Sequence, residues 1–110
     1  MNDLIVNFLE KSLEIFRARG GARLTYHDSE TNQVCAVGAM HDVSSKLINQ
    51  GQESTLTIMT DALSVINRIA LENYENAANS ILPIAAVNDL LGKDAVIHCY
   101  QLAIKKAKGE

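Results

Sequence analysis

Cys35-Ala36-Val37-Gly38-Ala39 is the stretch that decides how this chain folds, because an extended segment turns into a helix there. It sets a thiol and a glycine among three small apolar residues. The start of a helix can activate a thiol, since its free N–H groups and its dipole favour the thiolate. The same stretch also suits a closely packed element of the core, because free cysteine is among the most buried residue types. We favour the packing role.

The apolar pattern becomes helical from about Val34, and Gly51 is predicted to close this second helix. A glycine inside a helix lowers its stability by roughly 1 kcal/mol relative to alanine. With Ala36 and Ala39 beside Gly38, we expect a neighbouring helix to cross closely there and to compensate.

Before this stretch, the sequence predicts one helix and a small hairpin. Apolar residues recur at helical spacing from residue 4 to residue 16, and Gly20-Gly21 supplies a left-handed exit. Leu24 and Tyr26 then alternate with polar residues over 22–27, which is typical of a half-buried strand. A turn over 28–32 and a returning strand over 33–35 complete the hairpin.

After this stretch, the sequence predicts three more helical segments. The first carries a regular apolar stripe over 55–72, and the second is a short buried helix that is capped near Ser80 and ends near Leu91. Pro83 fits its first turn. Gly92 breaks this helix, and the last one follows. The sequence therefore predicts a mainly α fold, with four to five helices around one core, a short β-hairpin between the first and second helices, and a single domain over 1–110.

Composition narrows the classes of function. The 110 residues are 47% hydrophobic and carry a formal net charge of −3, with no broad basic face of the kind that nucleic-acid binding needs. No apolar run approaches the ~20 residues that span a bilayer, and no signal peptide is evident. We therefore expect a cytoplasmic protein with reduced thiols that binds neither nucleic acid nor membrane. Its two cysteines match no zinc spacing and no phosphate-binding glycine loop is present, so we expect no metal and no cofactor.

A thiol enzyme is the alternative reading of Cys35. The base would be His27, because the hairpin brings that strand towards the cysteine. His41 lies six residues further along the same helix, which places it about 120° around the axis and out of hydrogen-bonding reach. His98 approaches only through the fold. Because these residues do not assemble a catalytic set, we expect no catalytic residue, with Cys35 and His27 as the alternative pair.

Val87-Asn88-Asp89 ends an apolar run with two short polar side chains. Asn and Asp readily bond nearby backbone groups and so cap or bend the chain, and this is the role that we expect. The alternative is a polar pair that lines a groove beside the Cys35 helix. In that case, the protein is a small-molecule-binding sensor.

These two motifs resemble a small bacterial and phage-associated family of unknown function. In that family, a Cys-Ala-x-Gly-Ala helix follows a short hairpin, and an Asn-Asp pair precedes a final helix. The resemblance covers most of the chain after its first helix. It implies an architecture and two marked sites, and it implies no reaction.

We therefore expect a non-catalytic binding protein, such as a self-associating accessory protein or an inhibitor in a bacterial or phage system. Its partner is another protein or a second copy of the chain. The expected binding residues are Cys35, Gly38, Asn88 and Asp89.

Overall fold

Five α-helices and one short hairpin form the fold over residues 3–49, 55–77 and 80–109, which are the residues that the computed structural model describes. The mainly α class and the place of the hairpin are as the sequence predicts. The predicted helix end at Gly51 lies outside the described residues. In chain order, the elements are α1 (Asp3–Arg19), β1 (His27–Asp28), β2 (Gln33–Val34), α2 (Ala36–Asn49), α3 (Thr55–Asn73), the 3-10 turn η1 (Glu75–Ala77), α4 (Pro83–Leu91) and α5 (Lys93–Ala107).

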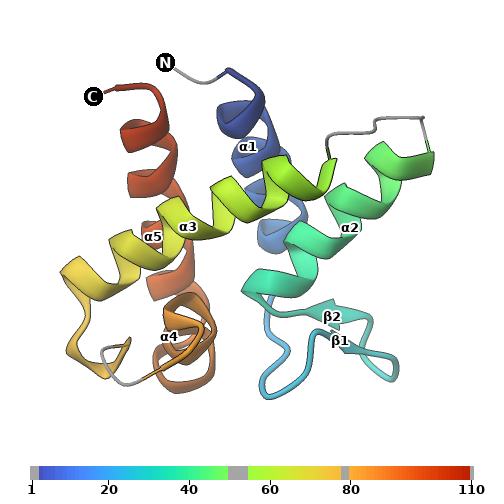
Figure 1. Ribbon diagram of the computed structural model, residues 1–110. Helices are drawn as coiled ribbons and strands as arrows, with labels where there is room; N and C mark the ends of the chain where they lie inside the picture. Colours follow the sequence, from blue (N-terminus) through green and yellow to red (C-terminus); the bar gives the residue numbers. More distant parts are fainter. Residues whose placement is uncertain (1–2, 50–54, 78–79, 110) are drawn as a thin grey trace.

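The long helix α1 forms the centre of the bundle and contacts α5, α2 and α3. In Figure 1, α3 crosses in front of α1 and α5, while the short α4 lies at the foot of α5. The hairpin lies below the start of α2 and contacts both α1 and α2 through β2. The segment between α1 and β1, the hairpin and α4 thus lie at one end of the bundle.

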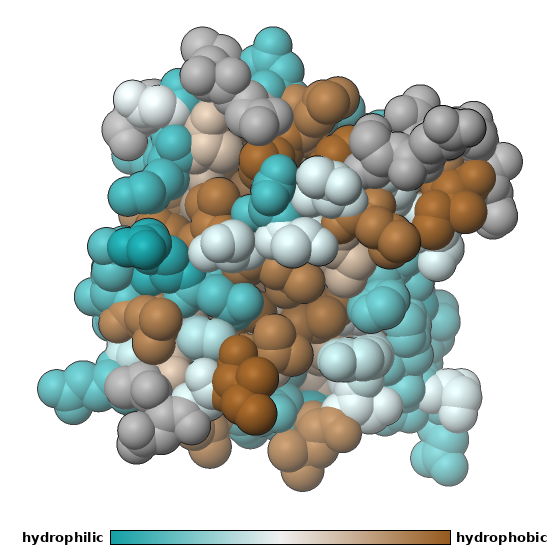
Figure 2. All heavy atoms as spheres, in the orientation of Figure 1, coloured by the Kyte–Doolittle hydropathy of each residue, from teal (hydrophilic) through white to brown (hydrophobic). Residues whose placement is uncertain are grey.

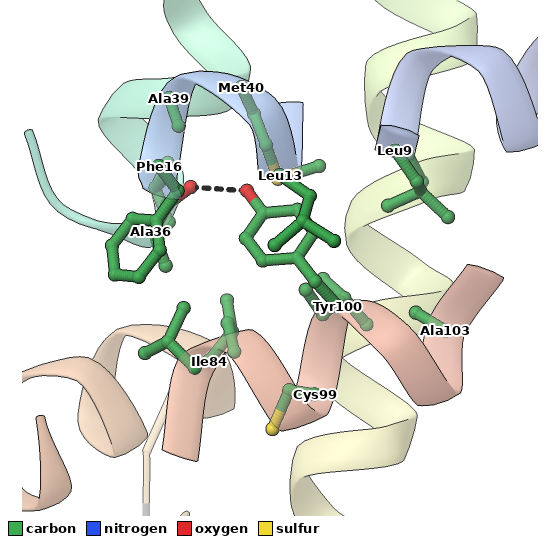
Figure 3. Packing of buried hydrophobic residues seen from close by; sticks show 14 of the residues in the cluster. Leu9, Leu13, Phe16, Ala36, Ala39, Met40, Ile84, Cys99, Tyr100 and Ala103 are labelled. Atoms are coloured by element: carbon green, nitrogen blue, oxygen red, sulfur yellow. Dashed lines mark hydrogen bonds between the residues drawn. The ribbon is translucent and has the colours of Figure 1, made fainter. Parts of the chain in front are cut away.

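The core is centred on Tyr100 of α5, whose side chain is fully buried (Figure 3). Its ring lies 6.1 Å from the ring of Phe16 on α1, measured between centroids. A buried tyrosine hydroxyl needs a hydrogen-bond partner, and this one donates to the carbonyl oxygen of Ala36 at 2.7 Å. The bond therefore fixes α5 to the first residue of α2.

The hairpin is shorter than predicted, and the segment that leads into it has a different conformation from the predicted strand. Only His27↔Val34 and Asp28↔Gln33 pair as strands. The expectation that Leu24 and Tyr26 face inward is wrong, because both are exposed. Leu24 has φ +63°, and this left-handed conformation interrupts the alternation on which the prediction rested.

Pro83 and Gly92 lie at the two ends of α4, and the end of the helix is where the sequence predicts it. Pro83 occupies its first turn, where the missing N–H removes no helical bond. Gly92 has φ +89° and separates α4 from α5. Ser80 lies ahead of the cap position, which Leu82 occupies, so α4 begins later than predicted. None of the helices in the described ranges combines the length and the apolar character needed to cross a membrane.

Candidate functional site

Cys35 occupies the N-cap position of α2 and uses its sulfur as the capping atom. The Sγ accepts a hydrogen bond from the N–H of Gly38 at 3.3 Å, three residues into the helix. A serine cap would make the equivalent bond with its hydroxyl oxygen. The carbonyl of Cys35 accepts from Ala39 at 3.0 Å, and the residue is only 5% exposed. Cys35 therefore begins α2 and fills the interior beside it.

Asn88 of α4 caps the same helix from the other side. Its Oδ1 accepts a hydrogen bond from the N–H of Ala36 at 3.0 Å, and its Nδ2 donates to the carbonyl of Ala22 at 2.8 Å. The residue is 3% exposed, so both bonds are shielded from water. We expected Asn88 to bond nearby backbone, but its backbone partners lie 52 and 66 residues away in sequence. Asn88 thus ties α4 to α2 and to the segment after α1.

Asp89 continues this network to the surface. Its Oδ1 accepts from Asn88 Nδ2 at 3.1 Å and from the N–H of Leu24 at 3.0 Å. The second bond fixes the backbone of Leu24, whose φ of +63° is rare for a residue with a branched side chain. The polar pair of α4 therefore determines how the segment before the hairpin presents its side chains.

Gly38 allows the backbone of the segment before β1 to pass close to α2. We had expected a neighbouring helix to cross closely here, but the nearest atoms to a Cβ at this position belong to the backbone of Tyr26. A Cβ at position 38 would lie 2.9 Å from the Tyr26 carbonyl carbon and still closer to its oxygen. The Tyr26 carbonyl also accepts the N–H of Cys35 at 3.1 Å. Gly38 is therefore required because the strand entry passes directly over the first turn of α2.

These contacts frame an open groove of about 530 Å³ between α4 and the segment before β1. In Figure 2, several hydrophobic side chains lie among polar ones along the lower edge of the molecule, where α4 and this segment lie. The groove brings Cys35 and Asp89 together at one place, which the sequence raised as an alternative. Its lining is Leu24, Thr25, Tyr26, Cys35, Leu82, Ala85 and Asp89.

The groove does not supply the chemistry of a thiol nucleophile. Burial raises the pKa of the Cys35 thiol, and this effect outweighs the N–H groups of Gly38 and Val37, which lower it. The thiol is therefore neutral at physiological pH. The ring of His27, the expected base, instead meets the carboxylate of Asp42, with Nε2 2.8 Å from Oδ1.

The rings of the other two histidines also contact side chains other than Cys35. His41 stacks against Tyr26, with 5.2 Å between ring centroids, and His98 Nδ1 lies 3.0 Å from the Tyr74 hydroxyl. Among the described residues, no three His, Cys, Asp or Glu side chains converge as a metal site. The polar groups around the start of α2 thus serve hydrogen bonds within the fold.

Of the residues that line the groove, sequence reasoning predicted Cys35 and Asp89 and missed Leu24, Thr25, Tyr26, Leu82 and Ala85. For Leu24 and Tyr26 the expectation was the opposite one. Their alternation with polar residues predicts burial, and nothing in the sequence signals a left-handed leucine. Comparison of the chain with family models, with curated proteins and with solved structures found no match. The resemblance to the phage-associated family therefore stays a prediction.

Proposed function

We propose that this chain is a non-catalytic interaction protein that self-associates through the groove beside α4. The observation that carries the proposal is the conformation and exposure of Leu24. This leucine is 87% exposed and has a left-handed backbone. Such a backbone costs an ordinary residue about 1–2 kcal/mol. A glycine would relieve that strain and a polar side chain would suit water better, so the fold itself gains little from a leucine here.

The bond from Asp89 explains how Leu24 is held. It fixes the leucine backbone in the orientation that points the side chain outward at the rim of the groove. Backbone strain that is retained at an exposed position is characteristic of binding sites. A contact surface prepared in this way loses little conformational entropy on association.

A second copy of the chain is the partner that this arrangement suits. A two-fold symmetric dimer uses the same patch on both subunits, so that the patch must contain both a projection and a recess. Leu24 projects from the rim of a groove whose other lining side chains include Tyr26 and Leu82. In the proposed dimer, Leu24 of each copy enters the groove of the other, and the aromatic Tyr26 packs around it.

Sedimentation velocity over a wide range of protein concentration tests this proposal. We expect the wild-type chain to shift from monomer to dimer, and Leu24→Asp to remain monomeric because a carboxylate would be buried at the centre of the interface. Leu56→Asp is the matched control, since Leu56 is an exposed leucine of α3 that does not line the groove. A wild-type chain that stays monomeric, or a Leu24→Asp chain that dimerises as the wild type does, would refute the proposal.

A small-molecule sensor is the second candidate, because the groove volume falls within the 300–1,000 Å³ that is typical of ligand sites. A carboxylate from Asp89 and a hydroxyl from Thr25 lie among its apolar lining. Thermal unfolding against a panel of metabolites tests this function. A ligand that raises the melting temperature of the wild type, but not that of Leu82→Asp, would support it; no shift with any compound counts against it.

A further inference from the structure

A second groove lies between α1 and α2, away from the Cys35 end of α2. Its volume is about 440 Å³, and its lining alternates between apolar and charged side chains. Three apolar residues form the floor: Val43 is buried, and Ile15 and Leu47 are partly buried. The complete lining is Lys11, Glu14, Ile15, Ala18, Arg19, Val43, Lys46 and Leu47.

The charge of this groove is opposite to that of the whole chain. Three cations and one carboxylate line it, whereas the chain has a net charge of −3. Arg19 is partly neutralised, because its Nη1 lies 2.9 Å from Asp42 Oδ2. Lys11 and Lys46 are exposed and form no ion pair with another described residue. These two lysines come from different helices, so α1 and α2 each contribute one cation that forms no ion pair within the described part of the chain.

The spacing of the floor suits a helical partner. Lys11, Ile15 and Ala18 follow one face of α1 at intervals of four and three residues, and Val43 and Leu47 are four apart on α2. Two packed helices leave a groove that accepts the apolar stripe of a third. The long stems of lysines beside such a stripe cover its edge and leave their ammonium groups free to pair with carboxylates.

We infer that this groove binds an acidic amphipathic helix of a protein partner. The apolar residues of that helix, at i, i+3/i+4 and i+7, lie on Ile15, Val43 and Leu47, while its flanking carboxylates pair with Lys11 and Lys46. The opposite charges increase the rate of association and select against basic segments. This inference does not depend on the proposed dimer, because the two grooves share no lining residue.

Fluorescence anisotropy tests the inference with a labelled synthetic helix of about 18 residues. The probe carries leucines on one face and glutamates on both flanks, and its counterpart carries lysines in place of the glutamates. We expect the acidic probe to bind and the basic one to bind at least about tenfold more weakly. Binding of the acidic probe should also weaken from about 0.05 to 0.5 M NaCl.

Charge reversal locates the site. Lys11→Glu/Lys46→Glu should raise the Kd of the acidic probe by about tenfold or more and improve binding of the basic probe. Lys105→Glu/Lys106→Glu on α5 changes the net charge equally but lies outside the groove, so the Kd should change little. All four lysines are exposed, and circular dichroism verifies that both variants fold. The inference is overturned if the acidic probe does not bind, or if both double variants weaken binding equally. Repeating the titration with Leu24→Asp separates this inference from the proposed dimer, because that variant should bind the acidic probe as the wild type does.

Discussion

Replacing Asn88 with alanine removes the side chain that holds three segments together at the start of α2. The Asn88 amide accepts from the Ala36 N–H at 3.0 Å and donates to the Ala22 carbonyl at 2.8 Å. Both backbone partners belong to buried residues, as does Asn88 itself. Since water does not reach these groups, Asn88→Ala leaves a donor and an acceptor without partners.

The size of the effect follows from those two groups. Leaving a buried donor or acceptor unsatisfied costs about 1–3 kcal/mol, so the two together reduce the free energy of unfolding by about 2–6 kcal/mol. A domain of this size has about 5–15 kcal/mol in total, and Asn88→Ala therefore removes a large share of its stability. At an m-value of about 2 kcal/mol/M, the urea midpoint falls by about 1–3 M.

Urea unfolding followed by circular dichroism measures this loss. The measurement is made at two protein concentrations, because self-association would add a concentration-dependent contribution. Asn7→Ala is the matched control: Asn7 is exposed on α1, and its replacement should change the free energy of unfolding by less than about 0.5 kcal/mol. An Asn88→Ala chain within about 1 kcal/mol of the wild type would refute our account of the α2 cap.

Three further predictions concern the thiols and Gly38. Cys35→Ser keeps an N-cap acceptor and should leave the free energy of unfolding within about 1 kcal/mol of the wild type. Cys35→Ala loses the cap and should lower the free energy of unfolding by about 0.5–2 kcal/mol. Urea unfolding of both variants measures the difference, and equal stability of the two contradicts the capping role. Gly38→Ala should lower stability by about 1–3 kcal/mol despite its better helix propensity, because the new Cβ displaces the Tyr26 carbonyl, and an unchanged or higher melting temperature contradicts this. Burial raises the pKa of Cys99 from 9.0 to about 11, so the unfolded chain releases this proton first. Stability should therefore fall between pH 9 and about 11, by up to about 3 kcal/mol, and a pH series in which Cys99→Ala falls as steeply as the wild type rules this out.

Local patterns account for the helices. The apolar periodicities of α1 and α3 and the positions of Pro83 and Gly92 are short-range properties that a sequence displays directly. The fold class follows from them, because amphipathic helices of this length bury their apolar faces against one another. Asn88 and Asp89 likewise stand out in sequence, since two polar residues end an apolar run there.

The hydrogen-bond partners of Asn88 and Asp89 could not be predicted from the local sequence. Tertiary packing brings Asn88 next to Ala36 and Ala22, which are distant from it in sequence. An asparagine that caps a distant helix has the same local sequence as one that caps its own helix. Leu24 illustrates the same limit for strands, because its alternation with neighbours predicts an inward side chain and its positive φ reverses that orientation. Gly38 signals a close approach, but its neighbour is a backbone from the hairpin rather than a helix.

One hydrogen-bond network connects the interior of the fold to its proposed contact surface. It runs from the Ala36 N–H through the side chains of Asn88 and Asp89 to the backbone N–H of Leu24. A partner that contacts Leu24 therefore meets a residue that is anchored to the buried start of α2. The conformation of the surface and the stability of the core are then coupled, so a substitution that loosens the cap, such as Asn88→Ala, should weaken self-association even where the chain remains folded. The same network explains why a strained leucine persists, since its backbone can relax only by releasing a carboxylate that the buried amide of Asn88 holds in place.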